Sequence, residues 1–170
     1  MLVDKTDIIN HVEISKGVKD AKKNPYIKNA ERLDLRPLLG ELLYNDLVKN
    51  PTDTENVKLL DPFEYTYEGN LYNHEGLKKV LCLFAGARYF LYGSFTDTPF
   101  GYVQKNTPDS TPGEYNDRKS KYTNEKQIAM SFYSDVEKFL NRNSSLFPLW
   151  DNGNCSTNRR SGMRLTKITK

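Results

Sequence analysis

The chain has 170 residues, which suits one domain with a core that buries roughly two thirds of the unfolded surface. Hydrophobic residues make up 37% and charged residues 28%, so we expect a modest core and an extensive polar surface. Two distant cysteines argue against a disulfide scaffold, and no apolar run reaches the roughly 18 residues that suggest a membrane span. The N-terminus shows no signal peptide. We therefore expect a soluble, unexported protein without membrane contact.

The net charge of +3 is unevenly distributed along the chain. Residues 151–170 hold five basic residues and one acidic residue, so they carry +4 and residues 1–150 carry −1. This contrast divides the chain into a nearly neutral domain, 1–150, and a basic C-terminal extension, 151–170. Such an extension suits an acidic protein surface, nucleic acid or a membrane face, and charge alone does not choose between them.

The N-terminal third of the chain shows mainly helical spacing. Residues 1–15 fit a short helix or an extended arm, and the pattern does not decide between them. Residues 20–50 predict two consecutive helices that are broken near Leu33–Asp34, with Pro37 in the first turn of the second helix.

Two shorter patterns follow in the middle of the chain. Thr52 and Glu55 have the spacing of a capping box, which predicts one or two helical turns before Pro62. Aromatic and polar residues alternate over residues 63–67, which fits either a short strand or an extended loop.

The most apolar segment predicts a central helix from His74 to about Tyr92, with Asn73 as its N-cap. Arg88 is the only charged residue between Val80 and Tyr92, and a helix that is apolar on every side lies among its neighbours.

The last helix is predicted from about Tyr122 to Asn143, because apolar residues recur there at helical spacing. The preceding residues, 103–121, are polar and predict a long structureless loop after a turn at Pro99-Phe100-Gly101. The expected fold class is therefore all-α: a small bundle of three to five helices with a long polar loop and an extended basic C-terminal tail.

No catalytic, cofactor or metal site is predicted. The two histidines, His11 and His74, and the two cysteines lack the close spacing of a zinc site, and His74 is expected to cap a helix or lie on the surface. Phosphate-binding loops and nucleophile motifs are not found, so we do not expect an enzyme. The acidic residues of the helical and arm segments are expected on solvated faces; they are Glu13, Asp34, Glu41 and Asp46.

Five residues are candidate interface residues or loop anchors. A guanidinium on an apolar helix needs a buried partner or a surface that another protein covers, and for Arg88 we favour the buried pair. The apolar residues after the last helix cap the bundle or dock on a partner, and we favour the cap. The five candidates are Arg88, Phe100, Tyr115, Phe147 and Trp150.

The basic extension contains a strand-like alternation at residues 163–168, although the sequence shows no sheet within the chain for it to join. A strand without a partner in its own chain suggests a partner outside it. The candidate partner-binding residues are Arg159, Arg160, Met163, Arg164, Leu165, Lys167 and Ile168.

Several segments between about residues 5 and 150 follow one another in a distinctive order. They are Ile8–Ser15, Tyr26-Ile27, Leu38–Tyr44, Glu75–Lys79, Ala85–Tyr89, Thr98–Lys105, Phe139–Asn141 and Phe147–Trp150. In this order and spacing the chain resembles the head–tail connector proteins of tailed bacteriophages (adaptor or head-completion proteins), especially those of crAss-like phages.

The resemblance implies a non-enzymatic, helical subunit of a homo-oligomeric ring, usually of twelve copies, beneath the portal protein. Such a ring continues the DNA channel, which the genomic DNA crosses without sequence-specific contact, and a downstream neck or tail protein docks on it. The resemblance also implies assembly in the host cytoplasm and a final location in the virion. In that family, long loops and C-terminal segments grip the portal or neighbouring subunits.

The alternative from the residues themselves is a small nucleic-acid-binding protein that uses the basic extension. Its affinity would fall with salt at a slope of roughly 0.9 per phosphate contact on duplex DNA. Residues 1–150, at −1, offer no basic face to continue the footprint of the extension, which favours the connector.

Overall fold

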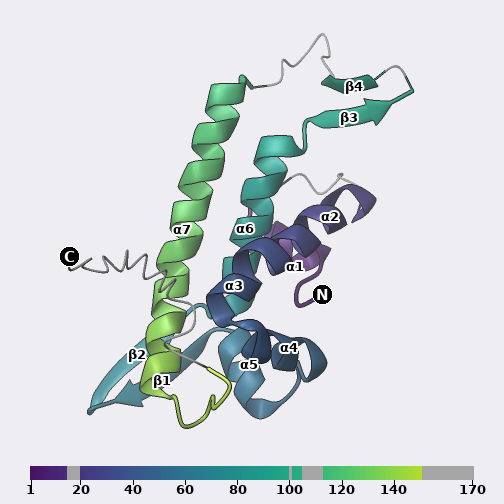
Figure 1. Ribbon diagram of the computed structural model, residues 1–170. Coiled ribbons are helices and arrows are strands. Elements are labelled where there is room, and N and C mark those ends of the chain that lie inside the picture. Colours follow the sequence, from purple (N-terminus) through teal and green to yellow (C-terminus); the bar gives the residue numbers. More distant parts are fainter. Residues whose placement is uncertain (15–19, 100, 105–112, 151–170) are drawn as a thin grey trace, which may run out of the picture.

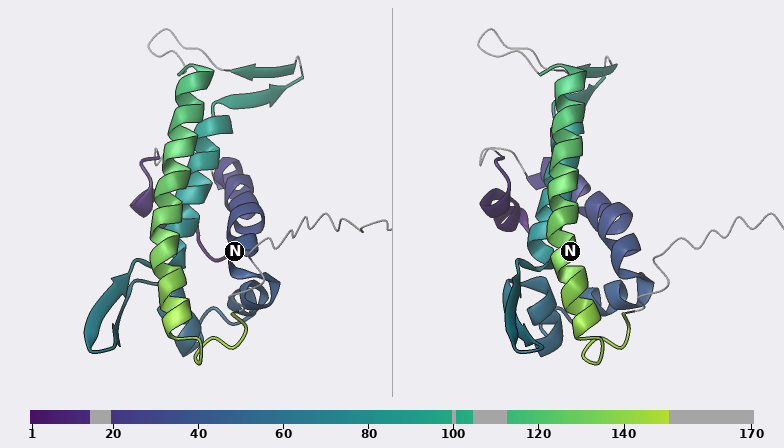
Figure 2. Two further views of the ribbon diagram at one scale, coloured as in Figure 1. Left: turned by 60° about the vertical axis from the view of Figure 1, so that its left-hand side comes forward. Right: turned by 90° about the vertical axis from the view of Figure 1, so that its left-hand side faces the viewer.

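The computed structural model describes residues 1–14, 20–99, 101–104 and 113–150. The predictions for Phe100, for residues 105–112 and for the C-terminal extension lie outside the described residues. Two long helices, α6 (Gly76–Tyr92) and α7 (Tyr115–Arg142), lie antiparallel and side by side (Figure 1). The shorter helices of the N-terminal half surround the lower and middle parts of this pair, whereas its upper end stands clear of them (Figure 2).

The expected central position of the apolar helix is confirmed. Every residue of α6 from Val80 to Ala87 is buried, because neighbouring elements cover this helix on several sides. Cys82 lies within this run and behaves as a small hydrophobe, since burial raises the pKa of its thiol.

The first residues form a helix, α1 (Lys5–His11), rather than an extended arm. Asp4 caps it, since its carboxylate accepts hydrogen bonds from the backbone N–H groups of Thr6 and Asp7. The residue after α1, Val12, packs against Gly86 of α6 so closely that a Cβ at Gly86 would lie 2.6 Å from its Cγ1.

The next helical segment has its break at a different place from the predicted one. Helix α2 (Asp20–Ala30) continues through a π-helical turn, η1 (Glu31–Leu35), into α3 (Arg36–Leu39), and the backbone stays helical at both junctions. Pro37 lies in the first turn of α3, as predicted. The chain turns instead at Gly40, whose φ of 77° favours glycine, and α4 (Glu41–Lys49) follows.

The middle of the chain forms a short helix and a β-hairpin. Helix α5 (Thr54–Leu60) begins after Asp53, so the predicted capping box from Thr52 is wrong. Strands β1 (Phe63–Tyr67) and β2 (Asn70–His74) pair antiparallel, with Phe63 opposite His74. The strand alternative for residues 63–67 is therefore confirmed.

The predicted starts of the two long helices are both wrong. His74 ends β2, and α6 begins two residues later with Glu75 at the N-cap position. Helix α7 begins at Tyr115 instead of Tyr122, which shortens the loop predicted over residues 103–121. A second antiparallel hairpin pairs β3 (Phe95–Thr98) with β4 (Gly101–Gln104), and the end of β4 further shortens the predicted loop.

The expected all-α fold class is therefore wrong. The described residues form seven α-helices and two antiparallel hairpins, so the fold is mixed although largely helical. The β1–β2 hairpin belongs to the core because the alternation of residues 63–67 buries Tyr65 while Glu64 and Thr66 face solvent. None of the described helices has the length and apolar composition that crossing a membrane requires.

Candidate assembly surfaces

An ion pair joins α6 to the π-helical turn. Arg88 donates its Nε–H to Oδ2 of Asp34 at 2.7 Å, and Lys126 of α7 lies 3.6 Å from the other carboxylate oxygen. Burial disfavours the charged guanidinium, but the hydrogen bond and charge of Asp34 outweigh it and raise the pKa of Arg88 above its ordinary value. The favoured buried pair for Arg88 is confirmed, whereas the expected solvated position of Asp34 is wrong.

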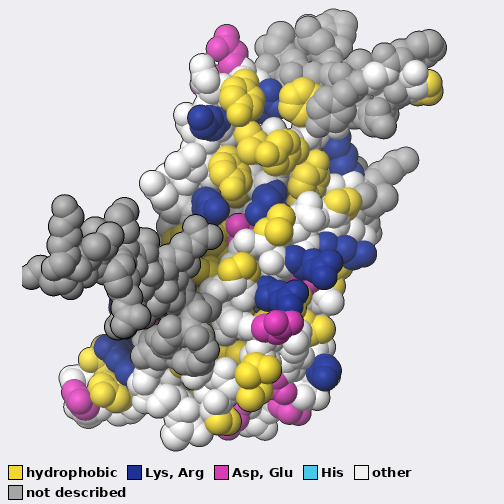
Figure 3. Space-filling view, in the orientation of Figure 1, with side chains coloured by type: hydrophobic (Ala, Val, Ile, Leu, Met, Phe, Trp, Pro, Cys, Tyr) yellow, Lys and Arg dark blue, Asp and Glu magenta, His cyan; other side chains and the backbone are white. Residues whose placement is uncertain are grey.

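Aromatic side chains gather around the upper end of the α6–α7 pair. Tyr92, the last residue of α6, is 49% exposed, and Tyr115, the first residue of α7, is 60% exposed. Both side chains are large aromatic rings, which are more often buried. The electrostatic effects of Tyr122 and Tyr92 also raise the pKa of Arg88. Hydrophobic side chains interspersed with Lys and Arg cover the upper part of this face (Figure 3). We call the set Tyr92, Phe95, Tyr115, Arg118 and Tyr122 the upper aromatic surface.

Arg118 holds the upper aromatic surface together. Its Nη1 donates to the backbone oxygen of Leu91 at 3.2 Å and to the hydroxyl of Ser94 at 3.0 Å. Its guanidinium carbon lies 4.6 Å from the ring centre of Phe95 and 6.0 Å from that of Tyr115, distances typical of cation–π contacts. One side chain therefore links the end of α6, the start of β3 and the first turn of α7.

The lower end of the α6–α7 pair is closed by residues 143–150, which we call the lid. Phe147 and Trp150 are only 3% and 9% exposed, and the Trp150 Nε1–H donates to Oδ1 of Asn141 at 2.9 Å. The favoured interpretation of these apolar residues as a cap on their own domain is therefore confirmed. Leu146 and Leu149 remain 43% and 40% exposed.

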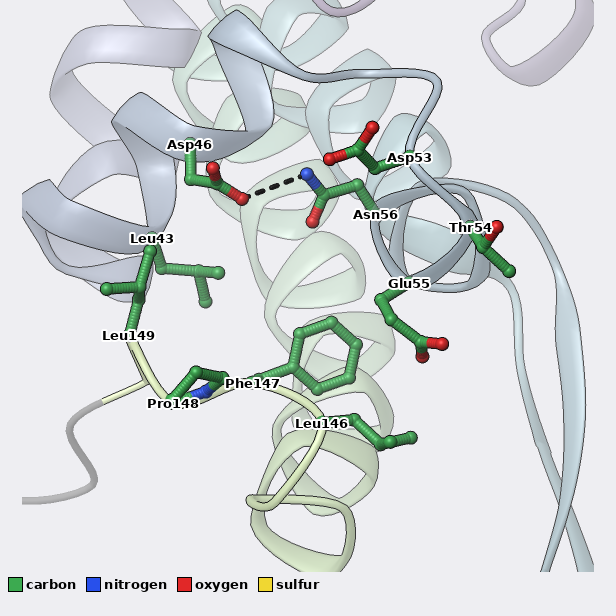
Figure 4. Close-up of a pocket in the computed structure, with 10 residues that line it drawn as sticks. All are labelled: Leu43, Asp46, Asp53, Thr54, Glu55, Asn56, Leu146, Phe147, Pro148 and Leu149. Carbon is green, nitrogen blue, oxygen red and sulfur yellow. Dashed lines mark hydrogen bonds between the residues drawn. The ribbon is translucent and has the colours of Figure 1, made fainter.

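A pocket of about 410 Å³ opens between α4, α5 and the lid (Figure 4). One wall is apolar and comes from α4 and the lid, and the other is polar and comes mainly from α5 and the turn before it. Asn56 in the polar wall donates to Oδ2 of Asp46 at 3.0 Å. The lining residues are Leu43, Leu146, Phe147, Pro148 and Leu149 on the apolar side and Asp46, Asp53, Thr54, Glu55 and Asn56 on the polar side.

The same end of the molecule is acidic. Residues 46–75 hold seven acidic residues and two lysines, so they carry −5, and the other residues of 1–150 carry +4. This segment comprises the C-terminal part of α4, all of α5 and the β1–β2 hairpin, which lie together at the bottom of Figure 1. We call residues 46–75 the acidic end.

His74 lies in the core, where its ring is 4.6 Å from that of Phe139. Burial lowers its pKa to about 4, although Asp135 and Glu75 partly oppose this change. Its Nδ1 accepts the backbone N–H of Gly76 at 3.1 Å, so the predicted helix-capping role is confirmed and the predicted surface position is wrong. Within the described ranges, no group of His, Cys, Asp and Glu is suited to hold a metal ion.

The structure separates the candidate interface residues into two groups. Arg88 and Tyr115 belong to the upper half of the α6–α7 pair, and Phe147 and Trp150 belong to the lid at the other end. Phe100 and the seven candidate residues of the extension lie outside the described residues. Sequence analysis missed Arg118, whose signal was its position three residues after Tyr115 on one helical face.

Comparison with protein families gives one match, a family of unknown function, DUF6712, over residues 35–160. The matched region runs from the end of η1 through the lid and into the basic extension. Neither the curated proteins nor the solved structures compared contain a match. The chain belongs to the DUF6712 family.

Proposed function

We propose that the chain is a virion structural protein that forms an oligomeric ring between portal and tail, as its resemblance to head–tail connectors implies. The observation that carries this proposal is the exposed upper aromatic surface at the projecting end of the α6–α7 pair. In the assembled ring, a neighbouring copy covers this surface. The ring continues the DNA channel and presents a docking surface to neck or tail proteins.

The exposure of Tyr92 and Tyr115 supports a protein partner. Tyrosine is favoured at protein interfaces, where the ring is buried and the hydroxyl keeps a polar contact. The two rings also lie on a rigid support, since Arg118 ties the first turn of α7 to the end of α6. A rigid, exposed aromatic cluster loses little conformational entropy when a partner covers it.

The charge distribution supports a second copy as that partner. The acidic end carries −5, whereas the upper half of α7, residues 115–128, carries +2, because its four basic residues outnumber its two acidic ones. Two different surfaces of opposite charge favour contact between unlike faces of identical subunits. Such a heterologous contact generates a ring when the rotation between subunits closes.

Native mass spectrometry of the full chain at increasing concentration tests the proposal. We expect one closed oligomer to appear at the expense of the monomer. Exchanging Tyr92→Ser and Tyr115→Ser together should abolish it, because both exposed rings are lost. The matched control is Leu33→Ser with Leu42→Ser, which removes two side chains that are 60% and 67% exposed outside both of these surfaces.

Three outcomes would contradict the ring. They are a monomer at every concentration, an open series of oligomers without a preferred size, and assembly of the tyrosine variant at the wild-type concentration. Titration of duplex DNA at two salt concentrations separates the nucleic-acid alternative, because only that alternative predicts strong binding that weakens steeply with salt.

A further inference from the structure

The pocket beside the lid combines an apolar wall with carboxylates. Leu146 and Leu149 leave part of their side chains exposed at the pocket, although the residue between them, Phe147, is buried. Asp53 contributes a carboxylate that has neither a hydrogen bond nor an ion pair with any described residue. The pocket therefore suits a segment in which apolar and cationic side chains follow one another closely.

We infer that this pocket binds the C-terminal segment 159–168 of its own chain. That segment contains Arg159, Arg160, Arg164 and Lys167 together with the apolar residues Met163, Leu165 and Ile168. The extension carries +4 and the acidic end, which includes the polar wall of the pocket, carries −5. Both the charge and the apolar content of the segment thus complement the pocket.

Connectivity favours the same chain over a second copy. The extension leaves the domain directly after Trp150, and the preceding residues of the lid form the apolar wall of the pocket. A random coil as long as the sequence from Trp150 to Arg164 has an end-to-end distance of roughly 20 Å. A segment tethered this closely has an effective concentration in the range of about 1 mM, well above ordinary protein concentrations.

Binding in the same chain would make the extension a competitor of outside partners for the pocket. While the segment occupies the pocket, its cations and apolar side chains are unavailable to other molecules, so a partner must displace it. The pocket lies outside the upper aromatic surface but within the acidic end, so a neighbouring copy that contacts the acidic end is one partner that must displace the segment.

Paramagnetic relaxation enhancement in the full chain tests the inference. A nitroxide is attached to Thr166→Cys in a Cys155→Ser background, where the remaining thiol, Cys82, is buried and unreactive. The labelled chain is diluted into an excess of untagged, isotopically silent chain to suppress contacts between copies. We expect the amide signals of Leu146 and Leu149 to weaken severalfold more than those of α1.

Two variants with the same change of charge serve as test and control. Asp53→Asn with Glu55→Gln removes two of the three carboxylates that line the pocket and should restore the Leu146 and Leu149 signals. Glu13→Gln with Asp117→Asn neutralises one exposed Glu and one exposed Asp outside the acidic end and should leave the weakening intact.

A mixture of tagged, isotopically silent chain with untagged, isotope-labelled chain identifies the source of the segment. We expect no weakening at the pocket in this mixture. The inference is overturned if the pocket signals weaken there, which would assign the segment to a second copy. It is also overturned if the weakening in the first sample spreads evenly over the surface around the lid, or if the pocket variant and the control behave alike.

Discussion

Arg88 and Asp34 form a largely buried ion pair that joins the central helix to the π-helical turn, with Nε and Oδ2 2.7 Å apart. Their side chains are 17% and 6% exposed. Loss of one partner from such a pair leaves a charge that water cannot solvate well. The pair therefore fixes the position of η1 on α6.

Replacing Arg88 alone should be costly. We expect Arg88→Met to lower the free energy of unfolding by about 3–5 kcal/mol, because the carboxylate of Asp34 stays buried without its main partner. Adding Asp34→Leu should recover part of this loss. Urea denaturation followed by circular dichroism measures both, and Arg36→Met, which breaks the exposed pair with Glu41, should cost less than about 1 kcal/mol. Equal losses for Arg88→Met and Arg36→Met would refute this account.

His74 should make stability depend on pH in a defined window. Its pKa is about 4 in the folded protein and near 6.5 in the unfolded chain, so only the unfolded state binds a proton between these values. The contribution is complete above pH 6.5 and is lost as the pH falls toward 4, by about 3 kcal/mol in total.

The variant that isolates this effect is His74→Asn, whose side-chain oxygen can still accept the N–H of Gly76. Denaturation at pH 7 and pH 5 should show a smaller pH dependence in this variant than in the wild type. His11→Asn, at an exposed position, is the control and should keep the wild-type dependence. An unchanged dependence in His74→Asn would show that other groups cause it.

Two glycines with similar φ values should differ in their tolerance of alanine. Gly40 and Gly76 have φ values of 77° and 80°, but only at Gly76 would a Cβ meet other atoms, lying 2.4 Å from the backbone oxygen of Leu60. We expect Gly40→Ala to cost about 1–3 kcal/mol from backbone strain, and Gly76→Ala to add about 1–3 kcal/mol from the steric clash. Thermal or urea unfolding of the two variants gives the difference, and equal stabilities would contradict the close approach of Gly76 to the end of α5.

Arg118 should stabilise the β3–β4 hairpin locally. Arg118→Met removes the hydrogen bonds to Leu91 and Ser94 while keeping an unbranched, apolar stem. A hydrogen bond from a charged group contributes about 1.5–3 kcal/mol, so amides in residues 95–104 should exchange with solvent at least about tenfold faster. Hydrogen–deuterium exchange measures this, and Lys119→Met should leave these amides unchanged, since the Lys119 side chain is exposed.

The sequence predicts an element correctly where the spacing of its apolar residues matches the side chains that the fold buries. The run around Cys82 predicted the central helix because a helix covered on several sides must be apolar on several sides. The alternation around Tyr65 predicts either a strand or an extended loop, because both can bury every second side chain. The position of Pro37 was correct because its fixed φ and missing N–H restrict it to few helical sites.

The errors fall where burial is partial or depends on distant residues. The first two turns of α7 lie at the projecting end of the helix pair, so residues 115–121 need no apolar stripe. Without that stripe, the sequence predicts a loop there instead of a helix. Asp34 was assigned to the surface because its partner, Arg88, is 54 positions away in the chain. The upper aromatic surface also combines residues of three elements, and the sequence predicts only one of them, Tyr115, as an interface residue or loop anchor.

The lid gives the molecule a built-in optical probe. Trp150 is the sole tryptophan of the chain, and its indole N–H donates to Asn141 at the end of the lid. Its emission spectrum therefore reports on the polarity of one defined spot, without any dye or label. Quenching of that emission by iodide or acrylamide follows the opening of this spot in real time, in the unmodified protein and at micromolar dilution.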